Sequence, residues 1–338
     1  MRTAGAVALL ALALVAASVS RAATGHTYTV AGPIDSLSLS ASGGNVAIHA
    51  AVEDGCPQSG VVWTPSTGHA VQLKDGCSSD ASYENLTLIG STAIWWDYDA
   101  GNHVYCSDVY TSPIAHPAPH GLGLCDGSQG DTYFEFTGDK TIVAVSDYTV
   151  CESDCTGADG KLLPDGDYGV EVKRLVGGKV VPLLKPVDLR TFLDARNWRV
   201  AVVEPNGVLT VYDTRGKRMW TAPNAGKLSS GWLAGNTVVG QQGNQIAVYA
   251  PGKAPRIVKT IPKKAVLTDV AGGIAIYTAG STVHLLRVSN GRDRALVTVK
   301  GLSDAQMSTA GVFYGVTTKN YDGVVTFVPL ADVLRKLR

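Results

Sequence analysis

The feature that most constrains this chain of 338 residues is a short phrase that recurs seven times. Each copy holds a half-apolar segment, a small turn and a segment rich in Val, Ile and Ala, as in 36–39 followed by 44–48. The second segments are marked by Val46, Ala93, Ile142, Val200, Val238, Ile274 and Val312, at intervals of 47, 49, 58, 38, 36 and 38 residues. Further alternating segments such as 208–212 follow, and a period of two with β-branched residues is typical of half-buried β-strands. The chain is therefore expected to be all-β, with 330–337 as the best candidate for a helix.

The spacing of the copies predicts how the strands are organised. Four short strands and their turns occupy about 40 residues, which is the repeat length of a propeller blade. We therefore expect a seven-bladed β-propeller that fills 23–338 as a single domain. The expected blades span approximately 33–80, 81–130, 131–187, 188–225, 226–262, 263–300 and 301–330. Two packed β-sandwiches are the alternative, because they also consist of short strands at regular spacing.

The seventh copy is one strand short. After 324–328 the chain turns to Pro329 and a basic tail, whereas 26–31 is an unassigned strand near the start. A ring with a missing strand would expose unpaired backbone groups along a sheet edge. We therefore expect the N-terminal strand 26–31 to complete the seventh blade and close the ring.

Two motifs make the chain similar to known repeat proteins. Trp96-Asp97 forms one Trp-Asp pair, and 213–220 contains Asp, Gly-Lys and Trp in the order found in quinoprotein repeats. The chain resembles, over nearly all of its mature length, the secreted β-propeller proteins with TolB-like, WD40-like and quinoprotein-like repeats. The resemblance implies that Trp220 docks against a neighbouring blade. Because only one blade carries the phrase, a quinone cofactor is not expected.

The N-terminus has the composition of a secretory signal peptide. Arg2 is followed by an apolar run at 4–17 and by a small-x-small cleavage site at 20–22, so we expect 1–22 to be removed before Ala23. The run is shorter than the roughly 20 residues that a helix needs to cross a bilayer. An uncleaved membrane anchor is the alternative. The mature protein is therefore expected to be secreted, extracellular or periplasmic, without membrane insertion.

All six cysteines lie in the first half of the chain, at Cys56, Cys77, Cys106, Cys125, Cys151 and Cys155. In an exported chain an even number of cysteines favours disulfides over metal thiolates. Several connectivities are open. Sequence order favours pairing Cys56 with Cys77, Cys106 with Cys125, and Cys151 with Cys155.

The three longest intervals begin with the first three copies, where the cysteines also lie. We interpret the extra residues as insertions at 53–60, 97–106 and 148–169, each after the second strand of its blade. Equivalent connections emerge on one face of a propeller, and inserted loops on one face often bind partners. The disulfide-braced loops are therefore candidate binding elements. The alternative is that they only cap the ring.

Charge is unevenly distributed along the chain. The 29 Lys and Arg residues equal the 29 Asp and Glu residues, so the basic surplus of a nucleic-acid binder is missing. Residues 23–187 hold 7 basic and 20 acidic residues, a net charge of −13, whereas 188–338 hold 20 and 9, a net charge of +11. A basic half can rest on an anionic cell-surface polymer, and an acidic half can attract a basic protein. Tuning of solubility is the alternative.

Two acidic clusters are candidate calcium sites, because Ca²⁺ prefers several closely spaced oxygen ligands. One cluster is Asp97 with Asp99, and the other is Asp165 with Asp167 in the third insertion. Solvated turn residues are the alternative. No other cofactor is expected.

Acidic residues also recur near the start of the first strand in several copies, at Asp35, Glu84, Asp131, Asp188 and Asp304. In a propeller this end lies near the central channel. Carboxylates that converge there would hold a cation or a polar ligand, and their mutual repulsion would raise some of their pKa values. Ordinary turn residues need no such role.

The sequence carries few catalytic signatures. There is no Gly-x-Ser-x-Gly elbow, no His-Glu-x-x-His and no phosphate-binding Gly-rich loop. The sequence favours a binding or protein-interaction module that acts through the disulfide-braced loops of blades one to three. The alternative is a propeller hydrolase, lyase or oxidoreductase with a metal or polar ligand at the channel mouth, because propeller enzymes assemble their sites from distant blades. A purely structural envelope protein is a third reading.

Overall fold

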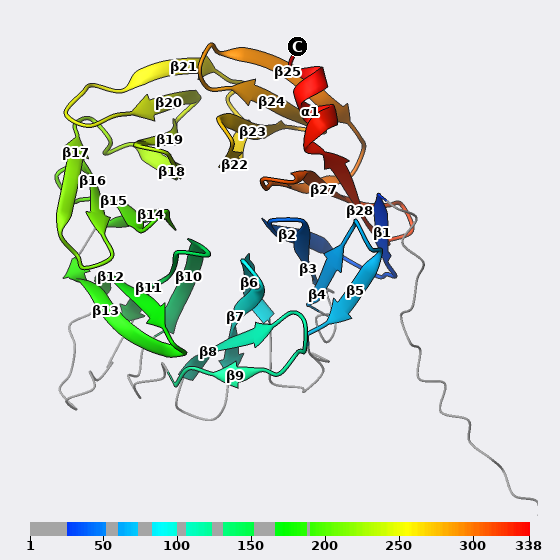
Figure 1. Cartoon of the computed structure of the whole chain (residues 1–338), viewed down its shortest axis with the longest axis horizontal. Helices are drawn as coiled ribbons and strands as arrows, with labels where there is room; N and C mark the ends of the chain where they lie inside the picture. The colour runs from blue at the N-terminus through cyan, green and yellow to red at the C-terminus, as the bar shows by residue number, and fades with distance from the viewer. Residues whose placement is uncertain are drawn as a thin grey trace, which may run out of the picture.

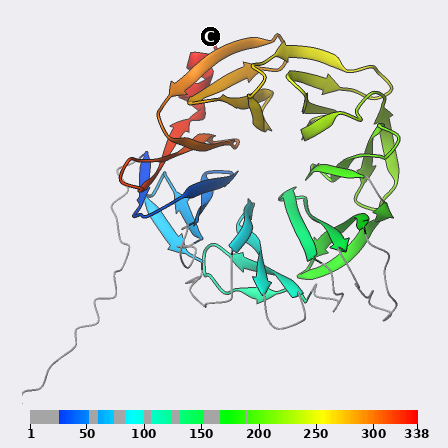
Figure 2. The same cartoon turned by 180° about the vertical axis from the view of Figure 1, so that it is seen from behind.

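The computed structural model describes residues 26–51, 60–73, 83–99, 106–123, 131–151, 166–187 and 190–338. These residues form seven antiparallel sheets of four strands each, and the sheets stand side by side in a ring (Figure 1 and, from behind, Figure 2). The chain is a seven-bladed β-propeller. The predicted fold class is confirmed, and the arrangement of two sandwiches is excluded.

The strands follow one another from the channel outwards in six of the blades. Blade one holds β2 (Ser36–Ser42), β3 (Asn45–Ala51), β4 (Val61–Thr64) and β5 (His69–Gln72). Blade two holds β6 (Tyr83–Ile89), β7 (Thr92–Asp99), β8 (Cys106–Pro113) and β9 (His120–Gly121). Blade three holds β10 (Asp131–Asp139), β11 (Ile142–Cys151), β12 (Gly166–Val176) and β13 (Lys179–Val187). Blade four holds β14 (Thr191–Arg196), β15 (Arg199–Val203), β16 (Leu209–Asp213) and β17 (Arg218–Ala222).

Blades five and six have the same order, and blade seven differs in its outermost strand. Blade five holds β18 (Leu228–Ala234), β19 (Thr237–Gln242), β20 (Gln245–Tyr249) and β21 (Arg256–Thr260). Blade six holds β22 (Val266–Ala271), β23 (Ile274–Ala279), β24 (Thr282–Arg287) and β25 (Arg292–Thr298). Blade seven holds β26 (Leu302–Met307), β27 (Gly311–Thr317) and β28 (Gly323–Pro329), with β1 (Thr27–Val30) as its outermost strand. The chain ends in the predicted helix, α1 (Leu330–Lys336).

All seven sequence markers lie on the second strand of a blade, from β3 to β27. These strands are rich in Val, Ile and Ala because neighbouring sheets cover both of their faces. In β15, for example, the four residues 200–203 are all buried. The repeated phrase therefore identifies the layer of each blade that is buried on both sides.

The tandem tryptophans of β7 illustrate the same packing. Trp95 and Trp96 are consecutive residues of one strand, so their side chains point to opposite faces. Both are buried, at 1% and 6% exposure. Trp95 packs toward blade one with Leu86, whereas Trp96 packs toward blade three with Phe134. Blade two has a neighbouring blade on each side. Side chains on both faces of β7 are therefore covered, and neither ring is exposed.

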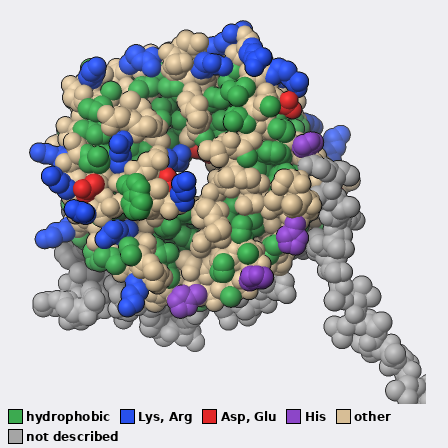
Figure 3. All heavy atoms as spheres, in the orientation of Figure 1, with side chains coloured by type: hydrophobic (Ala, Val, Ile, Leu, Met, Phe, Trp, Pro, Cys, Tyr) green, Lys and Arg blue, Asp and Glu red, His purple; other side chains and the backbone are tan. Residues whose placement is uncertain are grey.

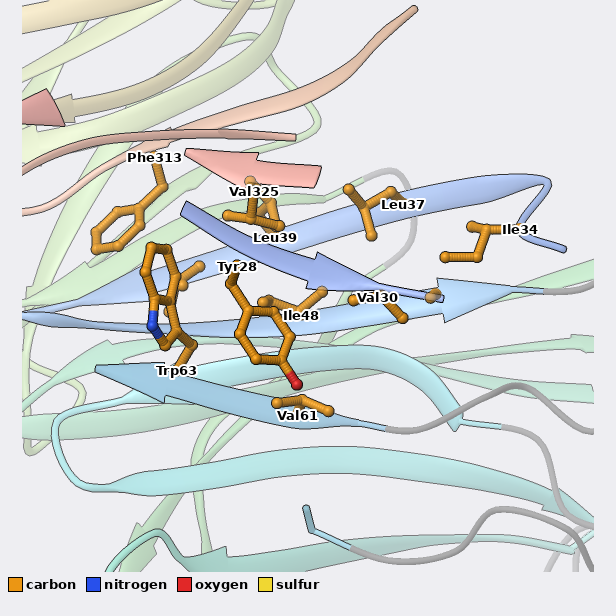
Figure 4. Packing of buried hydrophobic residues seen from close by; sticks show 12 residues of the cluster. Tyr28, Val30, Ile34, Leu37, Leu39, Ile48, Val61, Trp63, Phe313 and Val325 are labelled. Atoms are coloured by element: carbon orange, nitrogen blue, oxygen red, sulfur yellow. The ribbon is translucent and has the colours of Figure 1, made fainter. Parts of the chain in front are cut away.

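The seventh sheet joins the two ends of the described chain. β1 pairs antiparallel with β28, with Thr27 opposite Thr326 and Val30 opposite Gly323. Tyr28 then stacks on Trp63 of blade one at a ring-centroid distance of 5.8 Å, and Trp63 meets Phe313 of blade seven edge to face (Figure 4). Aromatic contacts of this kind add to the burial of apolar surface. The junction between blades seven and one is therefore a packed core.

A second set of contacts joins each blade to the next around the ring. In every junction a side chain of one blade forms a hydrogen bond with the backbone of its neighbour. These bonds join Ser40 Oγ to Leu88 N (2.9 Å), Asn85 Nδ2 to Phe134 O (2.9 Å), Asp139 Oδ2 to Asn197 N (2.9 Å), Asp194 Oδ2 to Leu233 N (2.7 Å), Gln241 Oε1 to Leu267 N (2.6 Å), Asp269 Oδ2 to Met307 N (3.0 Å) and Asp304 Oδ2 to Leu39 N (2.8 Å). Buried backbone groups need such partners, so these side chains hold the sheets in register around the channel.

Two strands are longer than the sequence suggested. β7 continues to Asp99 and pairs with β8 as far as Cys106, so the second insertion begins on a strand. β11 continues to Cys151 and β12 begins at Gly166, so the third insertion is shorter than 148–169. Polar residues in both places extend the strand pairing, because antiparallel ladders need only backbone groups.

Candidate functional site

The first strands of the blades, β2, β6, β10, β14, β18, β22 and β26, surround the central channel. Two cavities lie along it. One, here called the Glu135 cavity, has a volume of about 700 Å³ and is lined by the first strands and by the end of β3. The other, here called the hairpin cavity, has a volume of about 910 Å³ and is lined by the turns that join first to second strands. Arg196 and Asp269 line both cavities, so they form the boundary between them.

The boundary is a buried ionic cluster. Arg196 Nε lies 2.6 Å from Asp194 Oδ2, and Arg196 Nη1 donates to the carbonyl of Val270 at 3.0 Å. Asp194 also accepts a hydrogen bond from Thr137 Oγ1 at 2.7 Å. Burial alone would lower the pKa of Arg196, but the carboxylates of Asp194 and Asp269 raise it. The guanidinium is therefore permanently charged and held in place, with one side toward the channel.

At Asp269, in contrast to Arg196, burial affects the pKa more than the neighbouring charges and hydrogen bonds do. Its carboxylate accepts hydrogen bonds from Val270 N at 2.6 Å and from Met307 N. Burial raises the pKa of Asp269 to about 6, although Arg196 and the two N–H donors oppose this shift. The boundary therefore contains a carboxyl group that titrates between acidic and neutral pH.

Glu135 is an exposed carboxylate on the inner strand β10 that faces the channel. The channel walls remove part of its hydration, and this desolvation raises the pKa of Glu135. No ion pair or hydrogen bond joins its side chain to another described residue, so its oxygens are open to a ligand.

His49 lies on β3, on the same wall as Ser38, its cross-strand neighbour. Burial lowers the pKa of His49, so its imidazole is neutral at physiological pH. Its Nε2 atom is buried and has no hydrogen-bond partner among the residues that the structure describes. A buried ring nitrogen without a partner costs free energy, and such atoms are found where a ligand or water completes the bonding.

Apolar residues such as Leu39 and Phe192 share the rest of the lining of the Glu135 cavity with ten hydroxyl and amide side chains. They are Ser36, Ser38, Ser40, Asn85, Thr87, Thr137, Ser229, Ser230, Thr268 and Gln306. The half-buried indole of Trp232 and the ring of Phe136 are among the aromatic groups on the same wall. Hydroxyls both donate and accept hydrogen bonds, so this wall suits a ligand that does the same.

Of the five acidic residues that the sequence singled out near the channel, the structure describes the side chains of Asp304 and Asp35. Asp304 lies between blades seven and one, where its carboxylate accepts hydrogen bonds from Leu39 N and from Ala305 N. Burial raises its pKa. Asp35 is exposed at the start of β2 and does not line either cavity. The side chains of Glu84 and Asp131 and the whole of Asp188 lie outside the described part.

Most candidate metal ligands and cysteines also lie, wholly or with their side chains, outside the described residues. Asp97 and Asp99 lie on β7, Asp167 lies on β12, and Asp165 falls outside the described residues, as do all four side chains. Of the six cysteines, Cys106 begins β8 and Cys151 ends β11, and the other four fall outside. Among the described residues no group of three or more His, Cys, Asp or Glu could hold a metal ion. The calcium sites and the disulfides stay predictions.

The predicted signal peptide, 1–22, also falls outside the described residues and stays a prediction. In the part of the chain that is described, no helix is long and apolar enough to span a bilayer.

Comparison with known proteins bears on the fold. No family model matches the chain, and no curated protein matches it. Among solved structures, oligogalacturonate lyase from Vibrio parahaemolyticus superposes with a TM-score of 0.56 at 7% identity over 90% of this chain and 94% of that one. A variant of KlHsv2 with a replaced loop gives 0.51 at 10% identity, covering 84% and 89%. The computationally designed Ika8 protein gives 0.50 at 16% identity, covering 89% and 98%. These similarities show a propeller fold and no more, because the fold hosts unrelated functions.

Proposed function

We propose that this propeller is a binding protein that takes a small polyhydroxylated ligand, a mono- or oligosaccharide, in the Glu135 cavity. The observation that carries the proposal is the lining of that cavity: hydroxyl and amide groups surround Glu135 and His49, whose polar atoms have no partner among the described residues. A concave site with a few convergent polar groups is the usual form of a small-molecule site.

The charge of the channel selects among polar ligands. Arg196 is neutralised by Asp194, and His49 is neutral, so Glu135 and part of the Asp269 population leave the channel slightly negative. An anionic ligand would be repelled and would also have to share a desolvated site with Glu135. A neutral saccharide meets no such cost, and Trp232 offers it an apolar surface on which a sugar ring can pack.

The direct test is isothermal titration calorimetry of the purified full chain with neutral disaccharides (maltose, cellobiose and chitobiose) and with digalacturonate as the anionic probe. We expect one of the neutral sugars to bind with a Kd in the range of about 1 µM to 1 mM, the range of weak specific recognition, and digalacturonate to bind more weakly. Glu135→Gln and Ser230→Ala should each weaken binding about threefold to thirtyfold, because each removes one or two hydrogen bonds.

Glu171→Gln is the matched control, since Glu171 pairs with Lys173 on β12 and does not line the cavity. Equal affinities for Glu135→Gln, Glu171→Gln and the unaltered protein would place the site elsewhere. Absence of binding to every probe would remove the saccharide proposal.

The insertions of blades one to three are the second part of this proposal. Ala51, the last residue of β3, and Ser36, the first residue of β2, both line the Glu135 cavity. Because strands alternate in direction, β7 and β11 end at this same face. We propose that the connections that follow these strands contribute to binding at this mouth. Replacing 153–164 by a short Gly-Ser linker should weaken binding of the same sugar, and unchanged affinity would show that the third connection takes no part.

An enzymatic role is the second candidate, favoured by one observation. Glu135, whose pKa is raised, and His49, whose pKa is lowered, line one cavity, and opposite shifts of this kind are typical of acid and base pairs. If the protein is an enzyme, mass spectrometry should detect a cleaved or isomerised product of the sugar that binds. Glu135→Gln and His49→Gln would then abolish turnover while retaining measurable binding. If only the intact sugar is recovered after long incubation, the enzymatic role is excluded for that sugar and the binding role remains.

A further inference from the structure

Most acidic side chains of the later blades point inward, whereas Asp213 and Asp332 lie at the surface. Between residues 190 and 338, Asp194, Asp269 and Asp304 all bond to the backbone of a neighbouring blade. Glu204 receives hydrogen bonds from Tyr212 and Arg190, and Asp293 lies against Tyr277 and Lys259. Most carboxylates of residues 190–338 therefore bond to groups inside the protein. The charge on the surface of these blades comes mostly from their Lys and Arg residues.

Those basic residues form an arc on one face. The outermost strands of blades three to six each begin with an exposed basic residue: Lys179, Arg218, Arg256 and Arg292. Because strands alternate in direction, the start of each fourth strand lies on the same side as the turn between the first and second strands. We call this side the hairpin face. Figure 3 shows Lys and Arg side chains gathered over the blades that contain β12 to β25 and few over those that contain β1 to β9.

Exposed apolar side chains accompany the arc. Val181 is 37% exposed, Met219 47% and Ile257 44%, and each lies one or two residues after the basic residue that begins its strand. Single exposed apolar residues are ordinary on a protein surface. Their recurrence beside the basic residue in three successive blades is a pattern, and it repeats with the blade.

A tryptophan on the same face has an unusual backbone. Trp198 is 62% exposed, and it occupies the turn between β14 and β15 with φ of 61°. In blade six the equivalent position of the turn is Gly273, with φ of 75°. A left-handed conformation costs a bulky residue about 1 to 2 kcal/mol. Blade three maintains the turn, because Thr141 Oγ1 accepts a hydrogen bond from Trp198 N at 2.9 Å.

We propose that the hairpin face of blades three to six docks on an anionic lipid surface. The basic residues supply attraction to acidic headgroups, which falls off within about 10 Å at physiological salt. The apolar residues beside them, and the indole of Trp198, are of the kind that enters the headgroup layer. A soluble polyanion would use the basic arc but would gain nothing from Val181, Met219 and Ile257, so the apolar residues favour lipid over polymer. This inference is independent of the saccharide proposal, which concerns the other end of the channel.

The test is co-sedimentation of the purified full chain with vesicles of phosphatidylcholine alone and of phosphatidylcholine mixed with phosphatidylglycerol. We expect binding only to the mixed vesicles, weakened as salt rises from about 0.1 M to about 0.5 M. Arg218→Glu with Arg256→Glu should weaken binding by roughly two orders of magnitude. Met219→Ser with Ile257→Ser should weaken it roughly tenfold without changing the charge.

The matched control is Lys263→Glu with Lys264→Glu. These two exposed residues lie between β21 and β22 on the opposite face, so the same change in net charge should leave vesicle binding within about threefold. Circular dichroism of every variant checks that the fold is retained. An equal loss in the control pair, no binding to mixed vesicles, or binding to polyphosphate that matches vesicle binding and ignores Met219→Ser with Ile257→Ser would each overturn the proposal.

Discussion

The junctions of the early blades and those of the later blades are built from different chemistry. Blades one and two are tied to their neighbours by the hydroxyl of Ser40 and the amide of Asn85. From blade three onwards, carboxylates make all but one of the equivalent bonds, as with Asp194 and Asp269. Hydrogen bonds to charged groups contribute about 1.5 to 3 kcal/mol, against about 0.5 to 1.5 for neutral pairs.

The use of carboxylates in the junctions of the later blades is related to the charge on the surface of these blades. The connections of blades four to seven are short, so these blades have few contacts other than those between their sheets, and strong junctions matter more there. Because their carboxylates are used inside, the same blades present a basic exterior. Blades one and two have neutral junctions and carry two of the three insertions and four of the six cysteines, whereas the third insertion, with Cys151 and Cys155, belongs to blade three.

The largest effect is expected when a carboxylate junction is broken. Asp194→Ala removes the partner of Arg196 and leaves Leu233 N and Thr137 Oγ1 without their acceptor, so we expect the free energy of unfolding to fall by about 3 to 5 kcal/mol. Ser40→Ala removes one neutral acceptor and should cost only about 1 to 2 kcal/mol. Urea unfolding followed by tryptophan fluorescence measures both. Equal losses would mean that the two kinds of junction are equivalent.

A pH-dependent effect of intermediate size is expected at Asp269. Its pKa is raised from 3.8 to about 6 in the folded protein, so folding favours the protonated form. Relative to Asp269→Asn, the unaltered protein should therefore be most stable below about pH 4 and should lose up to about 3 kcal/mol as the pH rises through 6. Unfolding midpoints of both proteins between about pH 4 and pH 7 measure this difference. A difference that does not change with pH would show that Asp269 stays ionised throughout.

The smallest effect is expected at Trp198, and its sign is the opposite. Trp198→Gly relieves the left-handed backbone of an exposed residue, so we expect the free energy of unfolding to rise by about 0.5 to 1 kcal/mol. Trp198→Ala is the control, because it removes the ring but keeps a Cβ atom in the same conformation. Thermal unfolding compares the three proteins. Destabilisation by Trp198→Gly would mean that the indole packs on the turn and is not held out for contact with a surface.

The sequence predicted the fold well because the signal was periodic. The markers from Val46 to Val312 identify strands buried on both faces, and that burial is a property of every blade whatever its loops. The bounds of β7 and β11 were harder to predict. Polar runs such as Asp97 to Asp99 look like turns, yet they continue the ladder because backbone groups alone hold it.

The candidate site was less predictable. Asp304 was singled out, but its equivalents Asp194 and Asp269 were not, although all three follow an apolar residue by two positions: Phe192, Leu267 and Leu302. That apolar-x-Asp phrase was the available signal. In each case the strand has a register shift just before the acid, which turns the carboxylate toward the next blade.

Arg196, Glu135 and His49 had no comparable signal. Each is a single polar residue on an alternating strand, and the sequence does not say which side of an inner strand meets the channel. That depends on the tilt of seven sheets about a common axis, a property of the assembled ring.

The pairing of β1 with β28 has a consequence for the order in which the ring forms. Thr27 is among the first described residues to leave the ribosome, yet its partner Thr326 is synthesised nearly three hundred residues later. Until then the seventh sheet lacks a member and the first and sixth blades each have an uncovered flank. Individual sheets can form locally during translation. The ring closes only in a final, long-range step, the pairing of β28 with β1, on which the packing of every blade against its neighbours depends.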